Sequence, residues 1–255
     1  MKIFIITLFD SKERQAGMRN QLDKYNLKYE FIFGVDGRKL TKNEIDNLYD
    51  SNKAKLFKNE LNYTEIGCSL SHKLVYEKMI NENIDRAIVL EDGISLLPDF
   101  FSIINFFDDI KIDKFIIKLD RCYSGQKNND NFKSAKFTHW HRIKLTENYY
   151  IGQPFSNPYL TGAYYIDKNA AQVIYSLMPK IFLVADGWWF FRKIIKLRVI
   201  NTALTWRDWA YIPSIVSHKN DIKQTMNEEM LLLKYFKKVI YKIKRIIEWF
   251  LLFFK

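Results

Sequence analysis

Two adjacent acidic residues follow a short apolar run in the first half of the chain. The run at residues 87–90 (AIVL) leads directly into Glu91, Asp92 and Gly93. In an α/β sheet, ligands bind outside the carboxyl ends of the strands. Two carboxylates placed there can bind a hard divalent cation, which prefers oxygen ligands and can itself hold a diphosphate. The alternative interpretation is a solvated turn whose acids cap the next helix.

A second segment, residues 65–72 (EIGCSLSH), combines small residues with a histidine. We place it at the start of a helix, where Gly67 lets a ligand approach the backbone and free N–H groups favour anions. Ser71 and His72 are therefore candidates for a ligand site, with a purely structural role as the alternative. The Ser–His pair does not predict a hydrolase, because the sequence has no Gly-x-Ser-x-Gly motif.

Strands and helices alternate in the first half of the sequence and would position these residues. Strands are predicted at residues 2–8, 29–35, 87–90, 115–119 and 163–166, with an extended segment at 206–216. Helices are predicted at residues 13–25, 41–48, 68–83, 100–107, 168–177 and 186–197. The alternation predicts an α/β layered domain with a largely parallel sheet.

Composition excludes several classes of protein. The chain has 255 residues, of which 48% are hydrophobic and 16% aromatic, so it can bury a large core. Nine glycines and five prolines exclude a collagen-like or generically disordered chain. Two cysteines, Cys68 and Cys122, are too few for a disulfide scaffold or a cysteine-only zinc site. They favour a reducing compartment.

Much of the net charge of +11 lies at the end of the chain. Residues 234–255 contain seven Lys or Arg against the single Glu248, and their apolar residues recur every three or four positions. This pattern predicts an amphipathic helix with a basic face, which binds anionic membrane surfaces. The alternatives are docking on the core or an oligomer contact. Binding to nucleic acid is disfavoured, because the charge lies beside an apolar stripe.

No segment resembles a secretory signal or a membrane span. The apolar run at residues 3–8 is too short for a signal peptide and is followed at once by charge. No apolar run reaches the roughly 18–20 residues that cross a bilayer. We therefore expect a cytoplasmic protein.

Taken together, these motifs resemble glycosyltransferase family 25, the bacterial lipooligosaccharide glycosyltransferases. The family pattern Glu-x-Gly-Cys-x-x-Ser-His is matched by residues 65–72. Its Leu-Glu-Asp-Asp block is matched by residues 90–93, except that Gly93 replaces the second aspartate. Further similarity lies at residues 11–14, 35–37, 161–166 and 170–171. The resemblance covers approximately residues 1–220.

The resemblance implies a GT-A-like fold and a transferase that uses a nucleotide-sugar donor and inverts the anomeric carbon. It implies a hexose donor, for which we expect UDP-galactose, and a lipid-linked saccharide acceptor in lipooligosaccharide or lipopolysaccharide biosynthesis. Charge builds on the nucleoside diphosphate as it leaves, so a metal or basic groups must stabilise it. The acceptor hydroxyl must pass its proton to a carboxylate or imidazole within hydrogen-bond reach.

A divalent cation follows from the same resemblance, with Mn²⁺ as our expectation. Glu91 and Asp92 would bind it, and His218 is a possible third ligand, since neutral imidazole can join oxygen ligands on Mn²⁺. His218 could instead be a surface histidine before a polar loop. Gly93 stands where the family has its last acid. Its presence implies that the metal is bound weakly or not at all, or that the chain is catalytically impaired.

The resemblance also assigns residues to the reaction and to the donor. Asp186 matches the family's late Val-Asp element and is the expected general base, with a helix N-cap as the alternative. Asp120, after an apolar strand, is a second candidate, for the sugar or acceptor pocket. Arg14 could contact the nucleotide or lie on the charged face of the first helix. The full expected donor-binding set is Arg14, Asp36, Gly67, Ser71, His72, Thr161 and Gly162.

We therefore predict a glycosyltransferase domain at residues 1–225 and a basic amphipathic membrane-association helix at residues 226–255. The expected location is the cytoplasmic face of the bacterial inner membrane. The competing hypothesis is a non-catalytic binding or scaffold protein that kept the fold and lost its metal site at Gly93. Among enzymes, a glucosyl or N-acetylhexosaminyl transferase is the close alternative.

Overall fold

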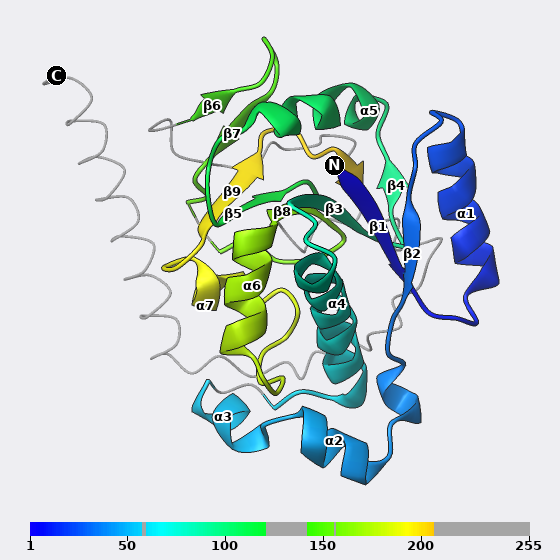
Figure 1. The fold of residues 1–255 in the computed structure, drawn as a ribbon, viewed down its shortest axis with the longest axis vertical. Coiled ribbons are helices and arrows are strands. Elements are labelled where there is room, and N and C mark those ends of the chain that lie inside the picture. Colours follow the sequence, from blue (N-terminus) through cyan, green and yellow to red (C-terminus); the bar gives the residue numbers. More distant parts are fainter. Residues whose placement is uncertain (58–59, 121–141, 156, 207–255) are drawn as a thin grey trace, which may run out of the picture. The chain divides into compact units, whose positions relative to one another are not determined.

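A computed structural model describes residues 1–57, 60–120, 142–155 and 157–206. An eight-stranded sheet forms its centre, in the order β2-β1-β3-β8-β5-β9-β7-β6 (Figure 1). Its strands are β1 (Lys2–Thr7), β2 (Glu30–Phe33), β3 (Arg86–Glu91), β5 (Phe115–Lys118), β6 (Ile143–Lys144), β7 (Tyr150–Gly152), β8 (Ala163–Asp167) and β9 (Lys196–Ile200). Strands β4 (Ser95–Leu96) and β10 (Thr205–Trp206) pair in a small second sheet. The predicted α/β architecture is confirmed.

The sheet is mixed, so the prediction of a largely parallel sheet is wrong. Strands β1–β2, β1–β3 and β5–β9 pair in parallel. The other four pairings are antiparallel, because β8 runs against β3 and β5 and β7 runs against β9 and β6. The reversal of β8 matters for function, because it brings the start of β8 to the edge where β3 and β5 end.

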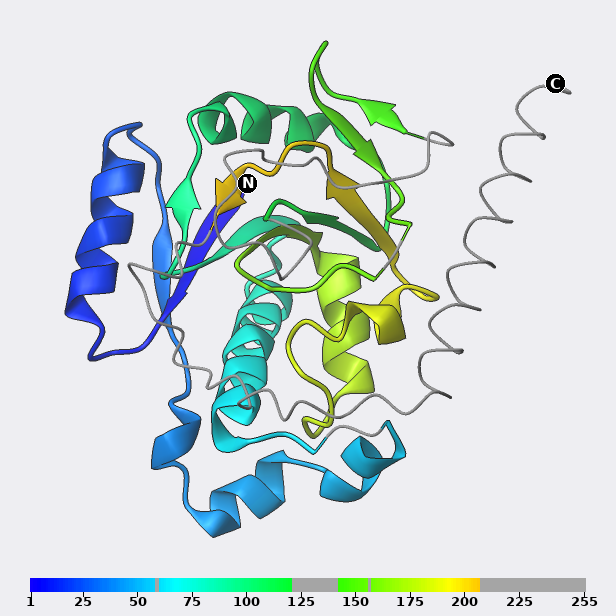
Figure 2. The same ribbon diagram turned by 180° about the vertical axis from the view of Figure 1, so that it is seen from behind.

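Helices cover both faces of the sheet. The helices are α1 (Lys12–Asp23), α2 (Lys42–Leu48), α3 (Ser51–Leu56), α4 (Tyr63–Asn81), α5 (Asp99–Ile103), α6 (Lys168–Leu177) and α7 (Trp188–Phe191), with 3₁₀ turns η1 (Gly37–Lys39) and η2 (Ile104–Asp109). Figures 1 and 2 show α4 and α6 side by side. They pack on one face, where Val75 and Ile174 share a core with Val89. Helices α1 and α5 supply Met18 and Phe100 to the core of the other face, with Leu90.

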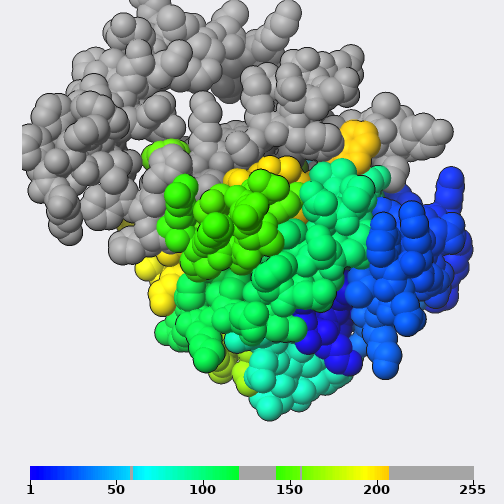
Figure 3. All heavy atoms as spheres, turned by 90° about the horizontal axis from the view of Figure 1, so that it is seen from above, coloured from blue at the N-terminus to red at the C-terminus, as the bar shows by residue number. Residues whose placement is uncertain are grey.

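On the second of these faces, the segment between α5 and β5 lies at the surface. Figure 3 shows this segment from above, beside the residues of β6 and β7 and with the N-terminal residues in blue next to it. The predicted helix at residues 100–107 is present as α5 continued by η2. A 3₁₀ continuation is common at the end of an α-helix, where the last carbonyl groups lack partners.

Helix α4 begins five residues before its predicted start at Cys68. Asn62 caps it: its side chain accepts a hydrogen bond from the Glu65 N–H, and the Glu65 carboxylate accepts one from the Asn62 N–H. Such a reciprocal capping box fixes where a helix begins. Gly67 therefore lies inside the helix, and the argument that free N–H groups there attract an anion is wrong. A capping box of the same kind, formed by Thr41 and Glu44, begins α2.

The segment predicted as a helix at residues 186–197 divides into two elements. Only Trp188–Phe191 is helical, and β9 begins at Lys196. Two aromatic residues of this segment, Trp188 and Phe191, are buried in the core. The extended segment predicted at residues 206–216 is described only at its first residue, Trp206, which ends β10.

Several predictions concern residues outside the described part of the chain. His218, the domain boundary at residues 225 and 226, and the basic helix at residues 226–255 all lie there. Among the described helices, none is long and apolar enough to cross a membrane.

Candidate active site at the carboxyl edge of the sheet

Polar residues gather at the edge where the central strands end. Glu91 is the last residue of β3, and Lys118 is the last of β5. Strand β8 starts at the same edge, because Ala163 pairs with Leu90 and Tyr164 with Lys118. The residues just before β8 therefore face the ends of β3 and β5. This is the edge at which open α/β sheets bind ligands.

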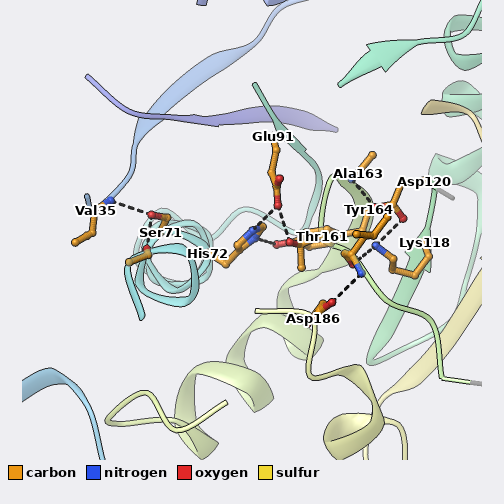
Figure 4. A network of polar contacts seen from close by, with 12 residues as sticks. Val35, Ser71, His72, Glu91, Lys118, Asp120, Thr161, Ala163, Tyr164 and Asp186 are labelled. Atoms are coloured by element: carbon orange, nitrogen blue, oxygen red, sulfur yellow. Dashed lines mark hydrogen bonds and ion pairs between the residues drawn. The ribbon is translucent and has the colours of Figure 1, made fainter. Parts of the chain in front are cut away.

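A short stretch before and into β8, residues 160–163, binds three carboxylates from three different elements (Figure 4). We call it the carboxylate-binding segment. The Leu160 N–H donates to Asp186 Oδ2 over 2.9 Å, and the Thr161 hydroxyl donates to Glu91 Oε1 over 2.6 Å. The Ala163 N–H donates to Asp120 Oδ2 over 3.3 Å. Predicted site residues Glu91, Asp120, Thr161 and Asp186 thus lie together.

Leu160 holds an unusual backbone conformation within this segment. Its φ is 69°, in the left-handed region that costs a non-glycine residue about 1–2 kcal/mol. Three hydrogen bonds offset that cost. The Leu160 N–H donates to the Asp186 carboxylate. The Leu160 carbonyl accepts hydrogen bonds from Lys118 Nζ at 2.6 Å and from Trp188 Nε1 at 3.0 Å. Strained, well-supported backbone of this kind clusters at functional sites.

A buried ion pair between Lys118 and Asp120 contacts the carboxylate-binding segment. Lys118 Nζ lies 2.7 Å from Asp120 Oδ1, and the side chains are 0% and 5% exposed. Burial raises the pKa of the Asp120 carboxyl, and the neighbouring Lys118 charge opposes that rise. Removing one member of such a pair leaves an uncompensated buried charge. Lys118 was missed in the sequence, although a single lysine inside the apolar run 115–119 (FIIKL) was the available indication.

His72 lies between Glu91 and a pair of buried tyrosines. Its Nε2 is 3.4 Å from Glu91 Oε1, and its Nδ1 is 2.8 Å from the Tyr164 hydroxyl. The Tyr164 hydroxyl donates to Tyr76 over 3.1 Å. Burial raises the pKa of Tyr164 well above its ordinary value and raises that of Tyr76, so both phenols keep their protons. His72 thus lies beside Glu91 at this edge, and its expected role toward the donor stays a prediction.

Asp92 lies on the opposite face of the sheet from Glu91. Its carboxylate accepts a hydrogen bond from the Thr7 hydroxyl at 2.7 Å and forms an ion pair with Arg14 of α1 at 3.5 Å. Burial raises the pKa of Asp92, while the Thr7 hydrogen bond and the Arg14 charge lower it. Successive strand residues point to opposite faces, which explains the separation.

This geometry does not fit the metal site predicted from Glu91 and Asp92. The two carboxylates have their partners on different faces of the sheet, and a guanidinium already neutralises Asp92. Gly93 supplies no ligand, and His218 lies outside the described residues. We therefore route no step of the chemistry through a cation held by Glu91 and Asp92.

Two of the expected donor-binding residues, Gly67 and Ser71, lie in a tight contact between α4 and the loop after β2. The Ser71 hydroxyl accepts from the Val35 N–H at 2.9 Å and donates to the Gly67 carbonyl at 2.7 Å. A Cβ on Gly67 would lie 2.5 Å from the Gly37 nitrogen. These contacts explain why the positions hold small residues. Their expected role toward the donor stays a prediction.

Asp36 and Gly162, also expected at the donor, have different surroundings. Asp36 caps η1 and accepts two hydrogen bonds from the Arg38 guanidinium, which lowers the pKa of its carboxyl. Gly162 belongs to the carboxylate-binding segment, and a Cβ there would lie 3.3 Å from Asp120 Oδ2. Glycine at this position lets the segment approach Asp120 closely, and its carbonyl accepts the Glu91 N–H at 2.8 Å.

Comparison with known proteins shows which protein family the sequence matches. The model of glycosyltransferase family 25 (LPS biosynthesis protein) matches residues 1–189. A glycosyltransferase 25 family member of Aedes aegypti is 34% identical over 102 residues, which cover 38% of this chain and 17% of the relative. Procollagen galactosyltransferase 2 of Mus musculus is 25% identical over 49% of this chain and 21% of the relative. Inactive glycosyltransferase 25 family member 3 of the same species is also 25% identical, over 49% of this chain and 22% of the relative. The chain thus matches only about a fifth of the length of these curated relatives.

We predict that Gly67→Ala lowers the free energy of unfolding by about 1–3 kcal/mol, because the added Cβ meets backbone atoms that cannot give way. The matched control is Gly17→Ala in α1, where a Cβ meets nothing within 4 Å. Alanine favours an exposed helix over glycine, so this change raises the free energy of unfolding by about 1 kcal/mol. Urea denaturation of both variants measures the difference. A Gly67→Ala protein as stable as the wild type would contradict the packing account.

Proposed function

The chain belongs to glycosyltransferase family 25, and from this premise we propose that it is an inverting hexosyltransferase that moves galactose from UDP-galactose to a lipooligosaccharide or lipopolysaccharide core. The family description names lipopolysaccharide biosynthesis, which supports this acceptor class. A relative named as a galactosyltransferase supports galactose as the hexose. The observation that carries the proposal is the grouping of Glu91, Asp120 and Asp186 around residues 160–163 at the carboxyl edge.

The proposed reaction is a single displacement. The acceptor oxygen forms a bond to the anomeric carbon, and the bond from that carbon to the diphosphate oxygen breaks. The acceptor hydroxyl loses its proton to a carboxylate of the protein, and the diphosphate leaves with the electron pair. Inversion follows, because the acceptor attacks from the side opposite the leaving group.

Asp186 is the carboxylate best suited to take the proton. It is half-buried, so it contacts both the protein and the space where an acceptor would lie. Its Oδ2 is fixed by the Leu160 N–H. Asp120 is less suited, because it is buried and paired with Lys118. We therefore assign Asp186 as general base and Asp120 with Lys118 as the pair that positions the segment.

The donor would lie along residues 160–163 and the end of β3, in a GT-A-like arrangement. Thr161, Gly162 and His72 lie at this edge. Arg14, which is paired with Asp92 on the other face of the sheet, is the basic side chain that we expect to contact the nucleotide. Basic side chains can stabilise the charge that develops on a leaving diphosphate. Discrimination among hexoses depends on a few hydroxyl contacts, so UDP-glucose and UDP-N-acetylglucosamine are the donors to compare with UDP-galactose.

We also propose that residues 226–255 bind the cytoplasmic face of the inner membrane. Seven basic residues and a repeating apolar pattern at positions 234–255 support this. A lipid-linked acceptor lies at that surface, so a membrane-bound helix would bring the enzyme to its substrate. Each basic residue near an anionic surface contributes about 1 kcal/mol.

The second candidate function is a binding or scaffold protein without transferase activity. Gly93 stands where the family pattern has an acid, and Asp92 is neutralised by Arg14. A relative that carries the name of an inactive family member supports this possibility. The two candidates differ in whether the purified chain turns over a donor.

We expect the wild-type protein with a lipooligosaccharide acceptor to consume UDP-galactose faster than the other two donors. Asp186→Asn keeps an acceptor for the Leu160 N–H but cannot take a proton. It should therefore lower turnover by about 10²–10⁴-fold while leaving UDP affinity unchanged. The matched control is Asp113→Asn, because Asp113 is exposed and bonds only Asn169 among the described side chains. No turnover by the wild type with any donor and acceptor, while UDP still binds, would favour the scaffold function.

For the membrane segment, we predict that Lys238→Glu with Lys242→Glu in the full-length chain weakens sedimentation with phosphatidylglycerol vesicles. Loss of the two attractive charges alone costs about 2 kcal/mol, which is roughly thirtyfold in partition coefficient, and the two added negative charges are repelled by the surface as well. Lys12→Glu with Lys24→Glu makes the same charge change at exposed positions of the domain and serves as the control. Equal binding by the two double variants would contradict the proposed membrane role.

A further inference from the structure

Cys68, His72 and Glu91 form a cluster of potential metal ligands beside the carboxylate-binding segment. Cys68 and His72 are one turn apart on α4, so they lie on the same side of the helix. A ligand atom of each of the three residues lies within 4.8 Å of the others. Within the described ranges, this is the one group of three such side chains that could hold an ion.

His72 presents its Nε2 to Glu91, and a metal ion would lie between the two atoms. The His72 Nδ1 is 2.8 Å from the Tyr164 oxygen, and the Nε2 is 3.4 Å from Glu91 Oε1. In the neutral tautomer with its proton on Nδ1, that proton is donated to Tyr164 and the Nε2 lone pair faces Glu91. A metal ion at the cluster would select this tautomer.

The surroundings match those of a bound metal in two further respects. Metal-binding histidines commonly use their second ring nitrogen in a hydrogen bond that fixes the ring, as Tyr164 does here. The Glu91 carboxylate is likewise oriented by the Thr161 hydroxyl at 2.6 Å. Its side chain is 15% exposed and Cys68 is half-buried, so an ion can reach the cluster from solvent.

Acidic side chains gather at this edge of the sheet. The Asp92 carboxylate forms an ion pair with Arg14, and the Asp120 carboxylate forms one with Lys118. A divalent ion bound by the Glu91 carboxylate and a Cys68 thiolate would add positive charge close to these acids.

We propose that Cys68, His72 and Glu91 bind a borderline divalent ion, with Zn²⁺ as the natural occupant. Thiolate, imidazole and carboxylate together are the ligands that Zn²⁺ accepts, whereas Mn²⁺ prefers an all-oxygen or oxygen-rich set. Binding replaces the thiol proton, which passes to solvent. Three protein ligands with a fourth position for water or another ligand is the arrangement of catalytic zinc sites. The metal site would share His72 and Glu91 with the proposed donor-binding edge, but its test does not require sugar transfer.

The test is a titration of metal-stripped, full-length protein with Co²⁺, which reports its ligands in its absorption spectrum. We expect a thiolate-to-cobalt charge-transfer band in the near ultraviolet and the visible bands of a tetrahedral ion, both removed by added Zn²⁺. Cys68→Ser should abolish the near-ultraviolet band, and Cys122→Ser, which changes the other cysteine, should keep it. A cobalt spectrum without a thiolate band, or a band lost in Cys122→Ser, would overturn the assignment.

A second measurement needs no variant and so does not depend on folding of the substituted proteins. Wild-type protein is labelled with iodoacetamide with and without Zn²⁺, and each cysteine is followed by mass spectrometry. Zn²⁺ should slow the labelling of Cys68 at least tenfold and leave that of Cys122 unchanged. Equal labelling of Cys68 in both conditions would refute the site. Neither readout uses UDP-galactose turnover, so the outcome is separate from that of the proposed transferase.

Discussion

Three hydrogen bonds from one short segment to three carboxylates are the constraint on which the site depends. Residues 160–163 hold Asp186, Glu91 and Asp120 at the carboxyl edge of the sheet, although like charges at close range repel each other. Backbone N–H groups and a hydroxyl supply the compensating donors. Leu160 has a positive φ, and in this conformation its N–H donates to one carboxylate while its carbonyl accepts from Lys118 and Trp188.

Lys118 connects this segment to the stability of the whole domain. Its ammonium group is fully buried and contacts both the Asp120 carboxylate and the Leu160 carbonyl. Breaking a buried pair by removing one partner typically costs about 3–5 kcal/mol. The contact with Leu160 requires that β8 runs antiparallel to β5, because this direction brings the start of β8 to the end of β5. The reversal of one strand thus makes the site.

The sequence contained enough information for the location of the site but not for its internal contacts. Glu91 at the end of an apolar strand and His72 in a helix were predictable, because local patterns specify them. The separation of Glu91 from Asp92 follows from strand alternation, and the sequence prediction overlooked it. The direction of β8 and the contact of Lys118 with the Leu160 carbonyl join segments far apart in the chain, and no local pattern encodes them. The start of α4 was misplaced because the capping residues Asn62 and Glu65 resembled a polar loop.

The central claim is that a nucleotide sugar binds along the carboxylate-binding segment, and hydrogen–deuterium exchange tests it most directly. Full-length protein would be compared with and without saturating UDP-galactose. The account predicts slower exchange in peptides that contain residues 160–163 and 91–93. Binding of UDP-galactose that leaves residues 160–163 unchanged and protects another edge of the sheet would contradict it.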